Sequence, residues 1–488
     1  MLKTKTYSAD PHPGLSHDMQ SQAIVDELAA QPERVFELSV TEYFSLPEKS
    51  IAEYQLRALK KRFGELRPKI PVLDKLAQEQ ELETINTVED GAKLLFQHSV
   101  YKTYPLSFIE KKLFDRMTRW IGNLTAHDLS KVDVSNCESI DGWLDRLDAQ
   151  SPLRLVHSSG TSGKLSFLPH STVEMPVKVK AQKAYFQGFA GERNEDVSDF
   201  ERLPFIYFSY RYGGMGHSRM LDSVRDAMYG GNESMIYTLF PSRLSADVLS
   251  LGSRLAAADG LGERGRIKIS EQILEQRERF VAEQSQIADH SRRLFERLEK
   301  ELGGKKVTLF GSLTDIFNQT KVGMKNLFHP DSNILVGGGM KGNAIPSDWA
   351  HQISEMLGVK PIGMGYGMSE SMIGVPPCPK GYFHLPPAII AYLLDPGTGE
   401  VLARRGTQTG RLGIIDLTAK TLWGGFLTGD KVTIRWDNTR CACGRTGVRV
   451  DPDIRRYTAD EGGDDKITCA GAPKAHDNAL AFLAATID

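Results

Sequence analysis

The sequence predicts an α/β protein in which a helical region precedes a core of alternating strands and helices. Three observations lead to this class. Residues 22–147 place apolar residues near a 3.6-residue period, whereas from Leu153 onward short apolar runs alternate with helical segments. Residues 388–436 instead alternate apolar and polar residues around turn sequences. Strands separated by helices indicate a mostly parallel sheet, and the alternating stretch indicates a small antiparallel β subdomain.

The elements divide the chain into four expected regions. Residues 1–150 form a mostly helical region, and the best helical patterns cover residues 24–31, 53–66 and 108–124. Residues 151–387 form the α/β core, residues 388–455 the β subdomain, and residues 456–488 a C-terminal remnant. The predicted core strands are Pro204–Ser209, Met235–Phe240, Val307–Gly311, Ile334–Gly337 and Pro361–Gly365. The charged stretch 269–302 predicts one or two surface helices, with a coiled coil as the alternative.

Composition excludes several classes of protein. The 488 residues carry a formal charge of −2, with 40% hydrophobic and 25% charged residues. These values fit a globular chain and argue against a nucleic-acid-binding surface or wholesale disorder. No apolar run is long enough to span a membrane, and the N-terminus lacks the apolar core of a signal peptide. We therefore expect a cytoplasmic protein with neither nucleic acid nor membrane as partner.

The most informative segment is a loop rich in glycine and hydroxyl residues that follows an apolar strand. It reads Ser158-Ser159-Gly160-Thr161-Ser162-Gly163-Lys164. Glycines let a backbone approach a phosphate closely, hydroxyls add donors, and a lysine adds positive charge. The spacing differs from a Walker loop. The segment predicts phosphate binding, with a polar turn as the alternative.

Three later segments place glycines and polar residues at predicted strand ends. Gly365-Tyr366-Gly367-Met368-Ser369-Glu370 offers an aromatic ring for a purine and a carboxylate for Mg²⁺. Gly337-Gly338-Gly339-Met340 leaves room for something flat. Thr428-Gly429-Asp430 offers a carboxylate for the hydroxyls of a ribose. Each has an ordinary turn or loop as its alternative.

In this order, the four segments resemble the adenylate-forming superfamily, whose members make an acyl-AMP from a carboxylic acid and ATP. The closer resemblance is to relatives of phenylacetate–CoA ligase. It includes Tyr210-Arg-Tyr212-Gly-Gly-Met-Gly-His217, similar to their acid-pocket segment, and Cys443-Gly-Arg-Thr446, similar to their Cys-Gly-Arg-Thr segment. It covers roughly residues 100–475 and implies a large adenylate-forming domain with mostly parallel sheets flanked by helices.

The resemblance implies a role for each matched residue. The pyrophosphate end of ATP is assigned to residues 158–164, and adenine to Gly338, Gly339, Met340 and Tyr366, next to Gly367 and Met368. Ser369 and Glu370 are assigned to the α-phosphate and Mg²⁺, Asp430 to the ribose, and Arg445 to a further contact with the nucleotide. The expected catalytic residues are Thr161, Lys164, Glu370 and His217. The acid pocket is assigned to Tyr207, Tyr210, Tyr212, Met215, His217, Gly337 and Gly365, and its tyrosines suggest an aromatic or polar-substituted acid.

Four of the residues near the β subdomain form a candidate metal site. Cys378 and His384 precede the subdomain, and Cys441 and Cys443 lie in a turn near its end. Three thiolates and one imidazole are a closed tetrahedral donor set for structural zinc. Zinc is known in some phenylacetate–CoA ligase relatives, which this layout resembles. The alternative is a set of unrelated thiols.

The resemblance weakens at the C-terminus. Superfamily members carry a C-terminal lid domain that supplies a catalytic lysine. Residues 463–467 resemble the hinge, but Gly462 stands where an arginine is expected, and residues 470–473 resemble the start of the lid. The sequence ends at Asp488, so a truncated C-terminal domain is expected.

These observations predict ATP-dependent activation of a carboxylic acid, in which the acid is converted to an acyl-AMP and pyrophosphate is released. Transfer to an amine or thiol acceptor would follow, the acceptor being a small molecule, coenzyme A or a carrier protein. One alternative is an acyl-CoA ligase of the phenylacetate–CoA ligase type. Another is a degenerate, non-catalytic nucleotide-binding protein, which Gly462 favours and the intact Lys164, Glu370 and Asp430 oppose. A scaffold that docks partners on residues 269–302 is the third.

Overall fold

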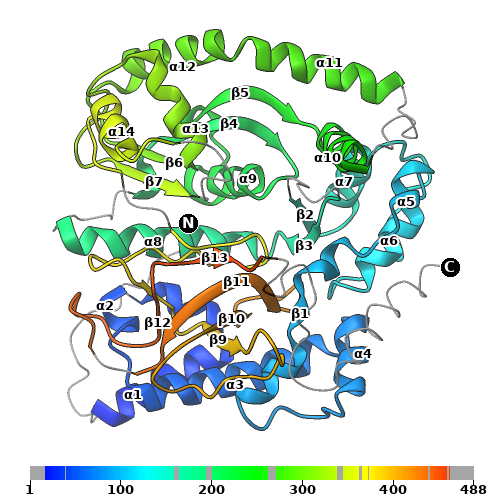
Figure 1. Cartoon of the computed structure of the whole chain (residues 1–488), viewed down its shortest axis with the longest axis vertical. Helices are drawn as coiled ribbons and strands as arrows, with labels where there is room; N and C mark the ends of the chain where they lie inside the picture. Colours follow the sequence, from blue (N-terminus) through cyan, green and yellow to red (C-terminus); the bar gives the residue numbers. More distant parts are fainter. Residues whose placement is uncertain are drawn as a thin grey trace.

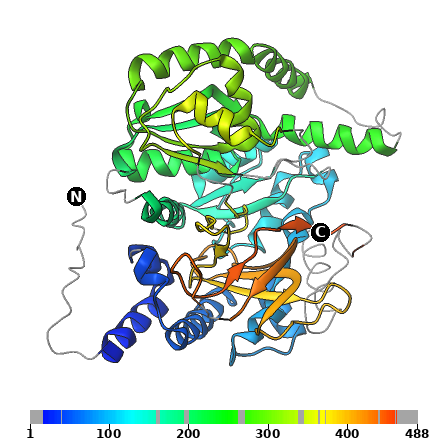
Figure 2. The same ribbon diagram turned by 60° about the vertical axis from the view of Figure 1, so that its left-hand side comes forward.

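The structure is a computed structural model with two stacked bodies. It describes residues 17–38, 40–158, 164–193, 200–261, 271–337, 345–361, 365–371, 373–437, 440–458 and 461. The lower body in Figure 1 combines the blue N-terminal helices with the orange strands from late in the chain, and the upper body contains the green and yellow middle of the chain. Figure 2 shows the same division from a second direction. Among the described helices, none combines the length and the apolar character needed to cross a bilayer.

Short helices dominate the first 150 residues, as predicted. They are α1 (His17–Ala30), η1 (Pro32–Glu37), α2 (Val40–Tyr43), α3 (Glu48–Leu66), α4 (Pro71–Glu79), η2 (Glu89–Leu94), η3 (His98–Lys102), α5 (Leu106–Glu110), α6 (Phe114–Gly122) and α7 (Ile140–Gln150). Pro71 occupies the first turn of α4, where its missing N–H is harmless. The pattern predicted over residues 108–124 is broken into α5 and α6, because Lys112 has a left-handed φ of 56° that interrupts a helix.

The lower body is built on a seven-stranded sheet. Its main path runs β8 (Phe383–His384), β12 (Arg449–Val450), β11 (Gly425–Arg435), β10 (Thr407–Asp416) and β9 (Ile389–Leu394), all antiparallel, while β1 (Phe96–Gln97) and β13 (Arg455–Arg456) also pair with β11. The predicted antiparallel region is confirmed, but it belongs to a larger sheet than expected. The expectation of mostly parallel sheets was therefore only partly correct. Antiparallel pairing has a larger share than expected, because segments outside residues 388–436 supply additional strands to this sheet.

The upper body holds a four-stranded parallel sheet. Its order is β5 (Ile236–Leu244), β4 (Phe205–Gly213), β6 (Thr308–Ser312) and β7 (Asn333–Gly337), and these strands confirm four of the five predicted core strands. For the fifth, residues 362–364 lie outside the described residues. The surrounding helices are η4 (Phe200–Arg202), α9 (Gly216–Tyr229), η5 (Glu233–Met235), α10 (Ala246–Leu261), α11 (Glu271–Ser285), α12 (Ile287–Leu302), α13 (Leu313–Asn318), η7 (Gln319–Val322) and α14 (Trp349–Leu357).

An antiparallel hairpin and one long helix lie between the two bodies (Figure 1). The hairpin consists of β2 (Leu153–His157) and β3 (Phe167–Ser171), and the helix is α8 (Met175–Arg193). The glycine-rich loop is the connection between the two hairpin strands. The position of α8 between the bodies brings its side chains close to segments from both.

The two bodies have separate hydrophobic cores. The lower core joins the N-terminal helices to the antiparallel sheet, through buried side chains such as Leu59, Trp143, Tyr392 and Trp423. The main upper core packs the parallel sheet against α12 and α14. The predicted N-terminal region and the predicted β subdomain, which are separated by more than 200 residues in the sequence, thus share one core.

Candidate functional site

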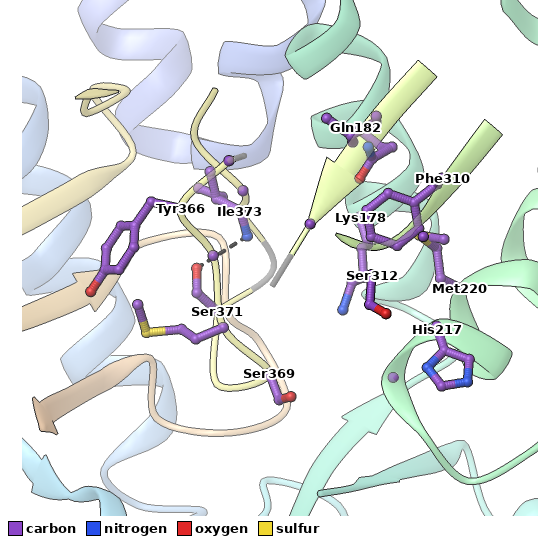
Figure 3. A pocket seen from close by; sticks show the side chains of 18 of the residues that line it. Lys178, Gln182, His217, Met220, Phe310, Ser312, Tyr366, Ser369, Ser371 and Ile373 are labelled. Carbon is purple, nitrogen blue, oxygen red and sulfur yellow. Dashed lines mark hydrogen bonds between the residues drawn. The ribbon is translucent and has the colours of Figure 1, made fainter. Parts of the chain in front are cut away.

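A cavity of about 310 Å³ opens between the bodies at the carboxyl ends of β6 and β7. It is bounded by α8, α9 and the segment 365–374. Figure 3 shows Tyr366, Ser369, Ser371 and Ile373 on one side, and Phe310, Ser312, Met220 and His217 on the other. Ligands of open α/β sheets bind outside the carboxyl ends of the strands, which is where this cavity lies.

The predicted adenine and ribose residues meet at one edge of the cavity. Tyr366 lines the cavity, and its hydroxyl donates a hydrogen bond of 2.7 Å to Oδ2 of Asp430 on β11. The Nε of Arg456 lies 3.0 Å from the other carboxylate oxygen of Asp430. Two backbone hydrogen bonds between Tyr366 and Val375 fix the loop, and a Cβ on Gly367 would lie 3.3 Å from the backbone of Gly374. The loop is therefore tightly folded behind the ring of Tyr366.

A buried polar network supports the turn that carries Ser369 and Glu370. Nε2 of His170 donates to the carbonyl oxygen of Ser369 at 2.9 Å. Glu174 is fully buried beside His170 and accepts hydrogen bonds from the backbone N–H groups of residues 420 and 421, at 2.5 and 2.7 Å. Burial alone would raise the pKa of Glu174, but His170, whose Nδ1 lies 3.8 Å from Oε2 of Glu174, and the hydrogen bonds from the two amides lower it. Glu174 is thus a buried carboxylate held in its charged form.

A second carboxylate, that of Asp416 at the end of β10, anchors the same turn. The hydroxyl of Ser371 donates to Oδ2 of Asp416 at 2.9 Å, while the hydroxyl and N–H of Thr418 donate to Oδ1 at 2.6 and 2.9 Å. Sequence reasoning missed these supporting residues, because their signal is only a polar side chain at the end of a strand. Their contacts tie the segment around Glu370 to the β2–β3 hairpin and to the lower sheet.

The base of the glycine-rich loop is described, but the loop itself is not. The N–H of Ser158 donates to the carbonyl of Ser166 at 3.0 Å, and the N–H of Ser166 donates to Oγ of Ser158 at 2.9 Å. Residues 159–163 lie outside the described residues. The ammonium of Lys164 lies 4.3 Å from the ring centroid of Tyr104, and burial together with Lys102 lowers the pKa of Lys164 to about 8.

An aromatic stack forms one wall of the cavity. The ring of Tyr207 on β4 stacks on His217 at 4.7 Å between centroids and on Phe310 of β6 at 6.1 Å, with interplanar angles of 25° and 26°. All three residues line the cavity. Burial raises the pKa of Tyr207 far above its ordinary value, so its hydroxyl stays neutral. A flat, mostly apolar group fits such a wall.

Three other residues predicted for the acid pocket lie elsewhere. Tyr210 is three residues from Tyr207, so alternation along β4 turns it to the opposite face, where it stacks on Phe240 and accepts a hydrogen bond from Gln284. Tyr212 is 41% exposed, and Met215 caps the start of α9 beside the upper core. None of the three lines the cavity.

Two cavity residues on α8 were not predicted from the sequence. Lys178 and Gln182 both line the cavity, one helical turn apart (Figure 3). A lysine and a glutamine on an amphipathic helix ordinarily indicate a solvated face, so the sequence carried no signal for them. Only the packing of α8 between the two bodies turns them inward.

The predicted glycines divide into described and undescribed positions. Gly337 and Gly365 line the cavity, as do Gly367, Met368 and Ser369. Gly338, Gly339 and Met340 lie outside the described residues, as do Gly462 and the hinge-like segment that follows it. Their assignments remain predictions.

The four predicted metal ligands come together at the β8 edge of the lower sheet. The ligand atoms of Cys378, His384, Cys441 and Cys443 all lie within 4.8 Å of one another. Nε2 of His384 is 3.4 Å from Sγ of Cys443. Burial raises the pKa of Cys443 to about 12 and lowers that of His384 to about 4. A tetrahedral zinc ion with bonds of about 2.3 Å needs sulfur atoms about 3.8 Å apart, so these residues fit such an ion.

Arg445 lies at this cluster and not at the cavity. Its guanidinium is 5.2 Å from the ring centroid of Phe44, and it shares a small pocket with His384. The predicted contact between Arg445 and the nucleotide therefore finds no counterpart in the described cavity lining. The Cys-Gly-Arg-Thr segment serves the cluster, because the turn that places Cys443 also fixes the neighbouring arginine.

Comparisons with known proteins identify no family for this chain. No family model matches it, and no curated protein matches it. Among solved structures it is similar to two ATP-bound RpMatB–BxBclM chimeras, B3 and B1, with TM-scores of 0.31, and to apo MatB from Rhodopseudomonas palustris, with a TM-score of 0.30. Each is 13% identical and covers 60% of this chain, whereas this chain spans about half of theirs, 46–47%. Similarity at this level is too weak to establish the fold or the activity of this chain. The function proposed for it therefore rests on the residues of the site.

Proposed function

We propose that this protein activates a carboxylic acid with ATP, forming an acyl-AMP and releasing pyrophosphate. The observation that carries the proposal is the hydrogen bond between Tyr366 and Asp430 at the edge of the cavity. These residues were assigned separately to adenine and ribose, 64 positions apart in the sequence. Their meeting beside Ser369 and opposite an aromatic wall supports one site for a nucleotide and an acid.

In the proposed reaction, a carboxylate oxygen attacks the α-phosphorus of ATP. The new C–O–P linkage forms as the bond to the bridging oxygen of pyrophosphate breaks, and the leaving group takes the electron pair. Negative charge builds up on phosphate oxygens, so positioning and electrostatic stabilisation supply most of the catalysis. The network of His170, Glu174 and Asp416 would hold the turn at Ser369 and Glu370 rigid during this step.

The cationic and metal-binding groups have distinct roles in this scheme. Lys164, with the hydroxyls and N–H groups of residues 158–163, would stabilise the departing pyrophosphate. Mg²⁺ bound through Glu370 and the phosphates would neutralise charge at the α-phosphate, an arrangement typical of Mg²⁺ sites with one protein carboxylate. The aromatic stack of His217, Tyr207 and Phe310 would hold the body of the acid.

The second step would transfer the acyl group to an amine or thiol. Acyl phosphates are activated, so a neutral amine or a thiolate attacks the acyl carbon and AMP leaves. Coenzyme A, a carrier protein and a small amine are the acceptors to compare. Formation of an acyl-CoA would make the protein an acyl-CoA ligase.

A specific observation favours one alternative, a protein that binds the nucleotide without turning it over. Both carboxylate oxygens of Asp430 are engaged, one by Tyr366 and the other by Arg456. A ribose would have to displace at least one of these partners. If Asp430 kept both partners, neither of its oxygens would be free for the sugar.

Acid-dependent exchange of labelled pyrophosphate into ATP tests the proposal. Purified protein with Mg²⁺ and ATP should catalyse the exchange with at least one member of a panel of aromatic, fatty and amino acids. ATP-induced thermal stabilisation without exchange would support the nucleotide-binding alternative. The absence of both would reject a nucleotide site.

A further inference from the structure

The lower body contains a second, smaller pocket, which we call the Arg404 pocket. It has a volume of about 70 Å³, and its lining includes residues 48, 51 and 55 of α3, Ile389 and Ala391 of β9, and Arg404 in the connection between β9 and β10. No described residue lines both this pocket and the cavity between the two bodies. A ligand of the Arg404 pocket would therefore be separate from the proposed nucleotide and acid.

Arg404 brings N–H donors into this pocket without an oxygen to accept them. Its side chain is half-buried and makes no hydrogen bond or ion pair with a described residue. The guanidinium lies 5.2 Å from the ring centroid of Trp436 and 5.9 Å from that of Tyr392. Burial lowers the pKa of Arg404, whereas Tyr392 and Glu89 act through space to raise it. The rings hold the charged group in place, but they leave its N–H groups without a hydrogen-bond acceptor.

The indole N–H of Trp436 is a second donor without a partner. Trp436 lines the same pocket and is 7% exposed, and its Nε1 is buried with no hydrogen-bond partner among the described residues. Buried indole N–H groups ordinarily find an acceptor, so an unpaired one at a pocket indicates an acceptor from outside the protein. Two adjacent side chains thus favour a ligand that carries oxygen atoms.

The rest of the lining limits the kind of ligand. Nε2 of Gln55 donates to two carbonyl oxygens of residues 387–389, at 3.0 and 3.1 Å, and the hydroxyl of Thr446 donates to the carbonyl oxygen of Phe44. These donors are already used by the protein. Most other lining residues are apolar, and the exposed Glu48 is the one acid among the described ones. The lining therefore favours a single negative charge attached to apolar atoms, because a dianion would meet Glu48 with few donors to balance it.

We propose that the Arg404 pocket binds a small monocarboxylate, with its oxygens on the guanidinium of Arg404 and the indole N–H of Trp436. The planar fork of a guanidinium matches a carboxylate. A water needs about 10–15 Å³ of such space, so 70 Å³ admits roughly five or six heavy atoms, the size of butyrate. Binding here needs neither ATP nor carboxylate activation. Because Gln55 already joins α3 to residues 387–389 at this pocket, the ligand should stabilise the lower body.

Indole N–H spectra report directly on Trp436. The chain has five tryptophans, and Trp436→Phe identifies the signal of Trp436 in protein labelled with ¹⁵N at its indoles. Butyrate should shift this signal in a saturable way. Butyramide should bind at least ~10-fold more weakly, because it cannot form the charge-assisted hydrogen bond, and inorganic phosphate several-fold more weakly. Equal affinity for butyrate and butyramide, phosphate binding as tight as that of butyrate, or no shift with butyrate would each overturn the proposal.

Variants of adjacent arginines locate the binding group. Arg404→Met keeps an apolar chain and should weaken butyrate binding at least ~10-fold, whereas Arg404→Lys keeps the charge without the fork and should weaken it about 3-fold. Arg405→Met is the matched control, because Arg405 is exposed and absent from the described lining. The other indole signals show whether each variant is folded, and if Arg404→Met is not, Arg404→Lys and the wild-type comparison of acid with amide decide. Equal losses in Arg404→Met and Arg405→Met would contradict the proposal.

A substitution in the cavity between the bodies separates the two sites. Gln182 lines that cavity and not the Arg404 pocket, so Gln182→Leu should leave the butyrate titration of Trp436 unchanged. Butyrate should also raise the melting temperature of the wild type and of Arg405→Met, but not that of Arg404→Met. Loss of the Trp436 shift in a folded Gln182→Leu protein would place the butyrate in the other cavity and overturn the proposal.

Discussion

The cavity and the Cys/His cluster are both assembled from segments far apart in the sequence, but they differ in what they leave unsatisfied. In the cluster, four metal-ligating atoms face one another within 4.8 Å. The cavity between the bodies has about 310 Å³ of space, and the buried amide nitrogen of Gln182 in its lining has no hydrogen-bond partner among the described residues. A closed donor set is typical of a permanent structural ion, whereas an open one indicates a ligand that enters and leaves.

The difference also separates stability from activity. Disturbing the cluster should loosen the lower body, because its four ligands join the edge strand β8, which pairs with β12, to nearby turns. Disturbing the cavity should change catalysis and leave the melting temperature almost unchanged. The experiments below test this separation, beginning with the largest expected effect.

Loss of a cluster ligand should destabilise the protein most. The purified protein should contain about one zinc per chain, and Cys443→Ser or chelation should lower the melting temperature by roughly 5–10 °C, because metal binding contributes directly to folding. Metal analysis and calorimetry would measure both. Cys137→Ser is the control, since Cys137 is buried outside the cluster. Metal-free protein of unchanged stability would remove zinc from the account.

Loss of the charged groups should slow pyrophosphate exchange without unfolding the protein. Glu370→Gln and Lys164→Ala should each reduce the rate at least ~10-fold, equivalent to about 1.4 kcal/mol of transition-state stabilisation. Steady-state exchange assays with calorimetry on the same samples would measure rate and stability together. Wild-type rates in both variants would mean that the charges do not act in the reaction.

Changes at the nucleotide edge should weaken ATP binding more moderately. Asp430→Asn should raise the KM for ATP about 10-fold, and Tyr366→Phe about 3-fold, because each removes one hydrogen-bonding group and leaves its neighbours in place. The KM for the acid should change less than 2-fold in both. Equal changes for ATP and acid would show that this edge does not belong to the nucleotide alone. Arg456→Ala should lower the KM for ATP, since it frees an oxygen of Asp430.

The pH dependence should give the smallest effect. The pKa of Lys164 is lowered to about 8 by burial and by Lys102, so its charge is complete well below pH 8 and is lost as the pH rises through 8. The exchange rate should therefore fall several-fold between about pH 7.5 and 9, and Lys164→Arg should flatten this fall, because arginine keeps its charge. Rates at saturating substrate would be compared across that range. A profile unaltered by Lys164→Arg would exclude Lys164 as the titrating group.

The sequence predicted the parts of the fold and site that local patterns determine. Strands β4–β7 were found because buried apolar runs end at glycines or polar residues. Tyr366 and Asp430 were singled out because each follows a glycine at a predicted strand end, and the four cluster residues because their types are chemically distinctive; the structure brings each set together. These features can be read from a few neighbouring residues.

What the sequence did not predict depends on packing between distant segments. Lys178 belongs to the cavity only because α8 lies between the two bodies, and His170 supports Ser369 across 199 positions. Tyr210 was misplaced because strand alternation was not applied to the acid-pocket segment. The break at Lys112 was missed because an apolar period does not report a left-handed backbone. Arg445 was assigned to the nucleotide although its segment folds around the Cys/His cluster.

The most direct test of the central claim is to follow an oxygen atom from the acid into AMP. The protein would be incubated with ATP, Mg²⁺ and the best acid of the exchange panel carrying ¹⁸O in both carboxylate positions, and AMP would be analysed by mass spectrometry. Attack of the carboxylate on the α-phosphorus predicts AMP with one ¹⁸O after the acyl group is transferred or hydrolysed. Unlabelled AMP, or ADP and phosphate in place of AMP and pyrophosphate, would contradict it.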